Sequence, residues 1–186
     1  MITFDLEGIK TAKLLLQDCP NKISVAAVNA INHTSRKLRT TISKTIRKEY
    51  VISAAKIKDS LNVQRASRTR LTGLIKSTGR TLPLDVFKVT APKNGGSLKA
   101  KVLKRNSPIS SPGMFRGTSR KGYTGLMMRK HRNRPYPLKI PHGPSVPQML
   151  GAEVVTNEIE KDAVKHLNER FLHEVNFQLQ KYKGGQ

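Results

Sequence analysis

Apolar residues recur every three or four positions between Ile23 and Ile46, and basic residues occupy most of the intervening positions. This spacing gathers the apolar side chains on one face of an α-helix, so it predicts a long amphipathic helix that ends near Tyr50. The apolar positions are Ile23, Ala27, Ala30 or Ile31, Thr34, Leu38, Ile42 and Ile46. A shorter helix is predicted before it, over residues 6–18, because Pro20 ends one helix and suits the start of another.

A third helix is predicted directly after the long one. Ser53 can cap its N-terminus, and Ala54, Ile57 and Leu61 follow at helical spacing. Two helices with a tight link also suggest a helix-turn-helix motif. The first of them is far too long for that motif, however, and the link at Tyr50 lacks the usual glycine.

Beyond Leu61 the apolar period changes from about four to two, which indicates β-strands. We predict strands over residues 71–77, 82–89 and 98–103, and a further strand over 126–129. In the third strand the apolar Ala100 and Val102 alternate with Lys99 and Lys101. Such alternation is typical of an antiparallel sheet with one face exposed to solvent.

Turn-forming residues fill the next two segments. Residues 106–125 are rich in Gly, Pro, Ser and basic residues, so we expect a mobile basic loop there. Residues 135–147 form a proline-rich segment, which we call the lead because it precedes the last predicted helix. It must be extended, because the residue before each proline avoids the helical conformation. After Pro147 a second long helix is predicted over residues 148–182.

The apolar stripe of that last helix recurs every four residues, and Val164 and Leu172 are expected to widen it. Its members are Val155, Ile159, Ala163, Leu167, Phe171, Val175 and Leu179. The predicted fold class is therefore α+β, with two long helices packed on a small antiparallel sheet that carries a long basic loop. We expect a single domain of residues 1–186: N-terminal helices to residue 61, the sheet and loop over 62–134, then the lead and the last helix.

The charge is strongly one-sided. The chain has 35 Lys and Arg against 12 Asp and Glu, a net charge of +23, and no carboxylate lies between Asp85 and Glu153. A positive field of this length needs an external counter-charge, and nucleic acid is the first candidate. We expect the basic loop to contact DNA or an acidic partner through Lys104, Arg105, Arg116, Arg120, Lys121, Arg129, Lys130, Arg132 and Arg134.

The rest of the composition narrows the choice of partner. Tryptophan is absent and aromatic residues make up 5% of the chain, so contacts with phosphates are expected rather than base stacking. The basic segment is not helical, and no stretch approaches the ~20 apolar residues of a membrane span, which argues against a membrane partner. Residues 1–10 contain no cationic segment followed by an apolar run, so we expect no secretory signal there. We expect a soluble protein made in the cytoplasm, with Cys19 as a small buried hydrophobe.

The motifs that could support catalysis are weak. The acid-free segment offers only His131 and His142, which supply neither a general-base pair nor ligands for Mg²⁺, so a nuclease is disfavoured. Residues 117–124 have the glycine spacing of a phosphate-binding loop, but Tyr123 stands where lysine is required.

The last predicted helix also carries side chains of the types that bind metals. His166, Glu169 and His173 are close enough in helical projection for metal binding, although a solvated helix face explains them better. We predict no catalytic residue, metal or cofactor.

Three segments carry a resemblance to a known family. They are the helix segment Ala26–Asn32, the strand entry Leu82-Pro83-Leu84, and the lead formed by Tyr136-Pro137-Leu138, Lys139-Ile140-Pro141 and Val146-Pro147. In these segments and their order the chain resembles the minor tail protein Z family of tailed bacteriophages, the lambda-type tail completion proteins.

The resemblance implies a structural virion protein at the head-proximal end of the tail, assembled in the host cytoplasm. Such proteins complete the tail so that it joins the head, and they are typically rings, often hexamers, around the DNA. The implied partners are further copies of the chain, a tail tube or terminator protein, the connector and genome DNA. The main alternative is a free-standing, ribosomal-like nucleic-acid-binding protein, and an enzyme is a weaker one.

Overall fold

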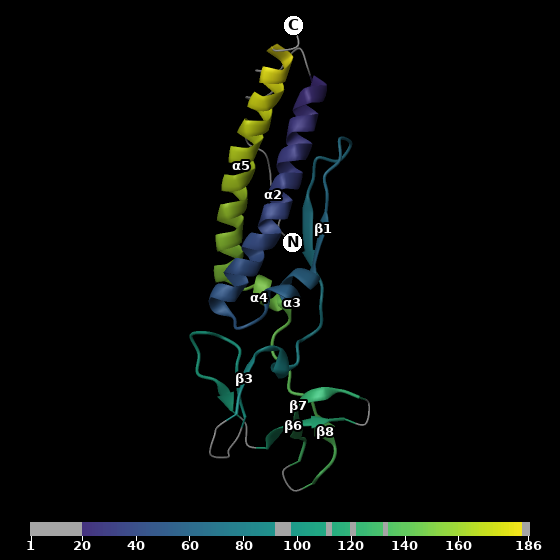
Figure 1. Cartoon of the computed structure of the whole chain (residues 1–186), viewed down its shortest axis with the longest axis vertical. Coiled ribbons are helices and arrows are strands. Elements are labelled where there is room, and N and C mark those ends of the chain that lie inside the picture. Colours follow the sequence, from purple (N-terminus) through teal and green to yellow (C-terminus); the bar gives the residue numbers. More distant parts are fainter. Residues whose placement is uncertain (1–19, 92–97, 111–112, 120–121, 132–133, 184–186) are drawn as a thin grey trace. The chain divides into compact units, whose positions relative to one another are not determined.

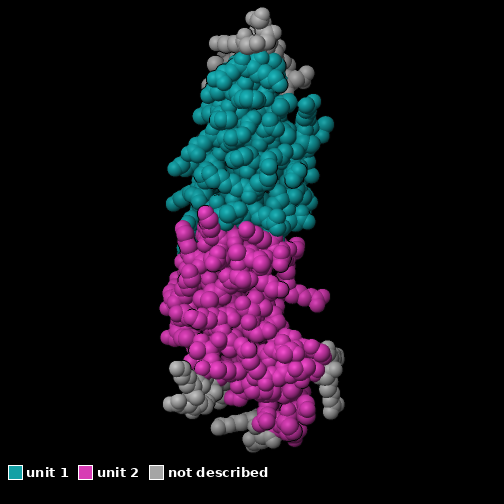
Figure 2. Space-filling view, viewed as in Figure 1, with its two compact units in different colours: residues 1–42, 61–77, 153–186 teal, residues 43–60, 78–152 magenta. Residues whose placement is uncertain are grey.

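The computed structural model describes residues 20–91, 98–110, 113–119, 122–131 and 134–183. The predicted helix over residues 6–18 and Cys19 lie outside the described residues. The chain divides into two compact units, coloured separately in Figure 2. Unit 1 contains residues Met1–Ile42, Leu61–Ser77 and Glu153–Gln186, and unit 2 contains Ser43–Ser60 and Thr78–Ala152. We describe each unit by itself, and the expectation of a single domain stays a prediction.

Two long helices dominate unit 1, as the apolar periodicity predicts. Helix α2 spans Pro20–Glu49, of which the part up to Ile42 belongs to unit 1, and helix α5 spans Glu153–Lys183. Within this unit α5 runs beside α2 in the opposite direction, so the end of α5 lies near the start of α2 (Figure 1). Both parts of the α+β prediction are confirmed, since helices and small antiparallel sheets are present.

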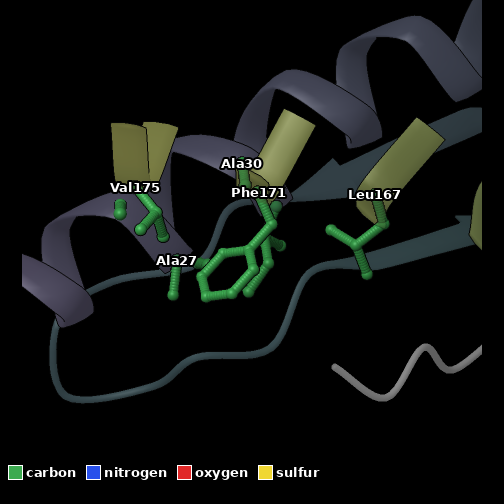
Figure 3. Close-up of a cluster of buried hydrophobic side chains, with 8 residues drawn as sticks. Ala27, Ala30, Leu167, Phe171 and Val175 are labelled. Atoms are coloured by element: carbon green, nitrogen blue, oxygen red, sulfur yellow. The ribbon is translucent and has the colours of Figure 1, made fainter. Parts of the chain in front are cut away.

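Small residues on α2 form the core of unit 1 together with large residues on α5. Ala27 and Ala30 of α2 face Phe171, which lies between Leu167 and Val175 on α5 (Figure 3). Ala30 is fully buried and Phe171 is 1% exposed. A large apolar side chain buried in this way contributes about 1.5–3 kcal/mol, while the alanines let the two helices approach closely.

The expectation that Val164 and Leu172 widen the apolar stripe of α5 is wrong. Val164 is 48% and Leu172 is 59% exposed, whereas their neighbours Ala163 and Phe171 are buried. Consecutive residues lie about 100° apart around a helix of 3.6 residues per turn. Because α5 buries only a narrow stripe with a period of four, the position next to each stripe residue points into solvent.

A β-hairpin packs on α2 within unit 1. It consists of β1, Leu61–Gln64, and β2, Leu74–Ser77, paired antiparallel with Leu61 opposite Ser77. The side chain of Asn32 fixes it to α2, because its Oδ1 accepts from the Ala66 N–H at 2.9 Å and its Nδ2 donates to the Ala66 carbonyl at 3.1 Å. The predicted strand over 71–77 is thus shorter, and Leu61 starts a strand instead of ending a helix.

Unit 2 begins with the end of α2 and the short helix α3, Ala54–Asp59. The Ser53 hydroxyl accepts from the Lys56 N–H at 3.5 Å, so the predicted cap is confirmed. The predicted strand over 82–89 is only partly correct. Leu84–Val86 forms a 3₁₀ helix, η1, and the strand that follows is β3, Lys88–Thr90. The amide of Leu84 bonds to the Pro141 carbonyl at 2.9 Å, which makes this region a partner of the proline-rich lead.

Two three-stranded antiparallel sheets complete unit 2. One joins β3 to β4, Lys99–Lys101, and β4 to β5, Ile109–Ser110. The other joins β6, Met114–Thr118, to β7, Thr124–Arg129, and β7 to β8, Leu138–Lys139.

The described parts of residues 106–125 therefore include strands where a basic loop was expected. Gly113 and Gly122 adopt positive φ angles of 88° and 80°, which glycine permits at turns. Met114, Leu126 and Met127 supply the buried side chains that order the β6–β7 hairpin.

The proline-rich lead is free of helix up to Ser145, whereas its last two predicted residues, Val146 and Pro147, are helical. Its Tyr136–Pro137 peptide bond is cis. The lead ends at Ser145, which forms a capping box with Gln148 at the start of helix α4, Val146–Leu150. The predicted helix over 148–182 is therefore two helices. Gly151 caps α4 and α5 starts at Glu153, a favourable residue for a helix N-terminus.

Candidate nucleic-acid interface

The positive charge is concentrated in unit 2. This unit has 20 lysines and arginines and only three acidic residues, which are Glu49, Asp59 and Asp85. Unit 1 has 15 basic and nine acidic residues and is much closer to balance. The net charges are +17 and +6. Unit 2 is therefore expected to attract a polyanion more strongly than unit 1.

Six of the nine basic residues predicted to contact DNA or a partner are described, and all six are exposed. Lys104 and Arg105 follow β4, Arg116 lies on β6, Arg129 ends β7, Lys130 follows it, and Arg134 lies before β8. Arg120, Lys121 and Arg132 lie outside the described residues. Most of these six residues lie on or next to strands rather than in one long loop, and their contact with DNA or a partner stays a prediction.

The sheet of β6, β7 and β8 separates two of these cations. Arg116 is opposite Leu126, and Lys139 is opposite Met128, so Arg116 and Lys139 share one face. Arg129 is opposite Leu138 and belongs to the other face, because successive residues of a strand point to opposite sides. This sheet presents positive charge on both sides.

A denser cationic face lies on the other sheet of unit 2. Lys88 on β3 is directly opposite Lys101 on β4, and Lys99 is opposite Thr90 and Ser110. Lys88, Lys99 and Lys101 therefore share one face, while Ala100 between them is fully buried on the other. Like charges directly opposite each other destabilise a sheet, so this face gains stability from a bound anion. We call these three lysines the lysine face.

The lysine face was missed as a contact site from the sequence. Alternation along 98–103 predicted that Lys99 and Lys101 share a face, and that prediction is confirmed. Nothing in the local pattern shows that Lys88 is their neighbour, because the pairing of β3 with β4 joins residues far apart in the chain. The signal in the sequence that could have indicated the lysine face is the presence of lysines and the absence of acidic residues in both strands.

The one carboxylate of residues 78–152 bonds within the unit. The Tyr123 hydroxyl, at the β6–β7 turn, donates to Asp85 Oδ1 at 3.1 Å. Burial and then the neighbouring Asp85 carboxylate raise the pKa of Tyr123 above its ordinary value. A side chain at Gly125 would place its Cβ 2.7 Å from Asp85 Oδ2, so glycine is needed for this approach. Asp85 thus holds the β6–β7 hairpin against η1.

The weaker motifs do not form chemical sites. Gly117 and Thr118 end β6, Thr124 starts β7, and the Ser119 N–H donates to the Tyr123 carbonyl at 2.7 Å. The described residues that follow form a strand rather than a helix that could bind a phosphate. On α5, His166 Nδ1 lies 3.5 Å from Glu169 Oε2 and 3.2 Å from Lys37 Nζ. Among the described residues no three His, Cys, Asp or Glu side chains are arranged to hold a metal ion. Of the helices in the described ranges, none combines the length and apolarity needed to cross a membrane.

The arrangement suits contacts with phosphates that do not depend on base sequence. Lysine and arginine side chains bind the backbone by charge, and the described strands of the two unit 2 sheets carry few aromatic residues for reading bases.

Comparison with known proteins agrees with the resemblance seen in the sequence. No curated protein and no solved structure matches the chain. The family model of the prophage minor tail protein Z (GPZ) matches residues 6–184, nearly the whole chain. The chain therefore belongs to the prophage minor tail protein Z family, whose members are structural components of the bacteriophage tail.

Proposed function

We propose that this tail protein is the completion or neck component at the head–tail junction, where several copies form a ring around the DNA channel. The observation that carries the proposal is the concentration of charge in unit 2, and above all the lysine face, where Lys88 and Lys101 are opposed without an acidic neighbour in the sheet. In a ring, this face would be turned toward the phosphates of the DNA.

Charge of this kind guides DNA without holding one sequence. A channel must let the whole genome pass, so contacts must be equal for every base pair. Lysines provide such contacts, since an ammonium group acts as a compact point charge on a flexible stem. The six described cations of the original prediction would extend the positive surface beyond the lysine face.

The same charges would also suit a free-standing nucleic-acid-binding protein, and an acidic surface of another tail protein could replace the DNA. These alternatives differ in assembly. A neck component forms closed rings or binds a tail-tube, terminator or connector protein, whereas a free-standing protein does neither.

Assembly is tested with the full chain, alone and mixed with isolated tails that lack it. Native mass spectrometry and electron microscopy would measure the number of copies and their position. We expect closed rings, or density at the head-proximal end of the tail. A protein that stays monomeric and leaves the tails unchanged would contradict the proposal.

The lysine face is tested by replacing Lys88, Lys99 and Lys101 together with glutamine. Binding to a short fluorescent DNA duplex is then measured over a range of salt concentrations. Each lost phosphate contact reduces the slope of log affinity against log salt by about 0.9, so we expect a reduction of about 2 to 3.

The matched control replaces Lys161, Lys165 and Lys181 of α5, which are exposed and remove the same charge from unit 1. This control is expected to change the slope far less. Equal slopes for the two triple variants would show that net charge alone attracts DNA, and would overturn the role of the lysine face.

A further inference from the structure

The β1–β2 hairpin of unit 1 carries a second concentration of cations. Residues 61–77 contain four basic residues and no acidic one, whereas the unit as a whole has 15 basic and nine acidic residues. Three of the four are arginines in and beside the turn, Arg65, Arg68 and Arg70, and all three are exposed. The turn projects at the end of the hairpin that lies along α2 (Figure 1).

The backbone of this turn is held by its own hydrogen bonds. The Ser67 N–H donates to the Arg70 carbonyl at 2.9 Å, and the Arg70 N–H donates to the Ser67 carbonyl at 3.1 Å. The Ser67 hydroxyl adds an acceptor for the Arg70 N–H at 3.2 Å. Together with the Asn32 contacts to Ala66, these bonds place the arginines on a fixed frame. Binding an anion therefore costs little backbone entropy.

A polar cleft lies beside the start of the turn. It has a volume of about 350 Å³, and Arg36, Arg65 and Arg170 line it together with His33 and Glu174. A water molecule occupies about 30 Å³ of liquid, so the cleft is large enough for an oxyanion with its hydration water.

The acid in this cleft already has partners. Glu174 is 6% exposed, accepts from Asn29 Nδ2 at 3.3 Å and pairs with Arg170. Three guanidinium groups face one paired carboxylate, which leaves the cleft positive. The Nε of Arg170 is buried and has no hydrogen-bond partner in the structure, although an arginine N–H normally has one.

The charged groups around His33 agree with a positive potential in the cleft. Desolvation, followed by the charges of Arg170, Arg36 and Lys37, lowers the pKa of His33 below its ordinary value, while Glu174 opposes the shift. The protonated, cationic form of the His33 imidazole is thus disfavoured, and the same surroundings would favour a bound anion.

We propose that the arginine turn and the adjoining cleft bind consecutive phosphates of a nucleic-acid backbone, with Arg36 and Arg65 at the cleft and Arg68 and Arg70 beyond it. The planar guanidinium fork matches the oxygen atoms of a phosphate. The arginines continue past the cleft, which a single phosphate ion would not require. Protein interfaces have an apolar centre, whereas between residues 65 and 71 only Leu71 exposes a large apolar side chain.

The test replaces Arg65, Arg68 and Arg70 together with glutamine in the full chain. Because these side chains are exposed and the turn is held by backbone atoms and Ser67, the variant is expected to keep its circular dichroism spectrum and melting temperature. Its slope of log affinity for duplex DNA against log salt is expected to fall by about 2 to 3. The same α5 triple variant at Lys161, Lys165 and Lys181 serves as the control.

A second measurement separates a nucleic-acid backbone from free phosphate. The histidine NMR signals are followed against pH with duplex DNA or with inorganic phosphate. We expect DNA at low concentration to raise the pKa of His33, with the effect lost on Arg36→Gln, and phosphate to act only at much higher concentration. A response to phosphate without one to DNA would overturn the backbone proposal.

The outcomes also separate this site from the function proposed above. One outcome is that the lysine-face variant shows a reduced slope of log affinity against log salt while the arginine-turn variant matches the α5 control. In that case the turn is not a contact site and the unit 2 proposal stands. If only the arginine-turn variant shows a reduced slope, the proposal that the lysine face contacts phosphates is wrong instead. Failure to form rings contradicts the neck role and leaves the binding of phosphates by the turn unaffected.

Discussion

Glu174 shows how a single buried charge organises the surface around it. The carboxylate is held by Asn29 on α2 and by Arg170 one turn before it on α5, so it joins the two helices. Breaking a buried pair by removing one partner is costly, because the remaining charge stays buried without compensation. The arginine side of the pair also adds positive potential next to His33, which belongs to the same surface of unit 1.

His33 is therefore expected to make the stability of the protein depend on pH. The folded-state pKa is lowered from the ordinary value of 6.5, so the unfolded chain binds more protons between the two pKa values. This group's contribution to the free energy of unfolding is complete above pH 6.5 and falls as the pH drops below it. Urea unfolding between about pH 5 and pH 8 should show a smaller loss toward low pH in His33→Gln than in the wild type.

Arg36→Gln provides the companion variant for this prediction. It removes one of the positive charges that lower the pKa of His33, so it should reduce the same pH dependence without removing the imidazole. Parallel stability profiles for the wild type and His33→Gln would show that His33 does not titrate with the expected shift.

At the scale of elements, close approach positions the hairpin on α2. Gly73 immediately precedes β2, and an added Cβ there would come within 2.7 Å of Ile31 Cγ2 and 2.8 Å of Ser35 Oγ. The Ser35 hydroxyl already donates to the Ile31 carbonyl at 2.8 Å, which restricts its movement. Packing against α2 thus requires a glycine at this position.

Gly73→Ala is expected to destabilise unit 1 by about 1–3 kcal/mol, because the new methyl group must push the hairpin from α2. Gly79→Ala is the matched control, since its Cβ would meet only Pro147 Cδ, at 3.9 Å. That control is expected to be neutral or slightly stabilising. Urea unfolding of both variants measures the difference, and equal free energies of unfolding would refute the close packing of the hairpin.

For the whole molecule, the distribution of charge predicts how DNA is bound. We propose that two cationic surfaces, one on each unit, contact phosphates, and aromatic residues make up only 5% of the chain. Affinity should therefore depend steeply on salt and little on sequence.

Duplexes of equal length and unrelated sequence are expected to bind with dissociation constants within about twofold of each other, because the phosphate backbone is common to all of them. Fluorescence anisotropy at several salt concentrations measures this. A sequence preference of more than about tenfold would instead indicate contacts to base edges, each worth about 1–3 kcal/mol.

The sequence by itself determined the two long helices, the Ser53 cap, the helix-free lead up to Ser145, the excess of charge and the family. These follow from local spacing, from composition and from short motifs, all of which can be recognised in the sequence without knowledge of tertiary contacts. The alternation around Ala100 likewise predicted that Lys99 and Lys101 share a face.

Only the tertiary structure decided which cations lie together and which apolar residues are covered. The pairing of β3 with β4 brings Lys88 to Lys101, and the narrow contact along α5 leaves Leu172 exposed beside buried Phe171. The β6–β7 hairpin forms in a segment whose composition indicates a loop, because Met114, Leu126 and Met127 are buried there and Asp85 binds its turn. Each outcome depends on a partner that is distant in the chain, so local periodicity could not predict it.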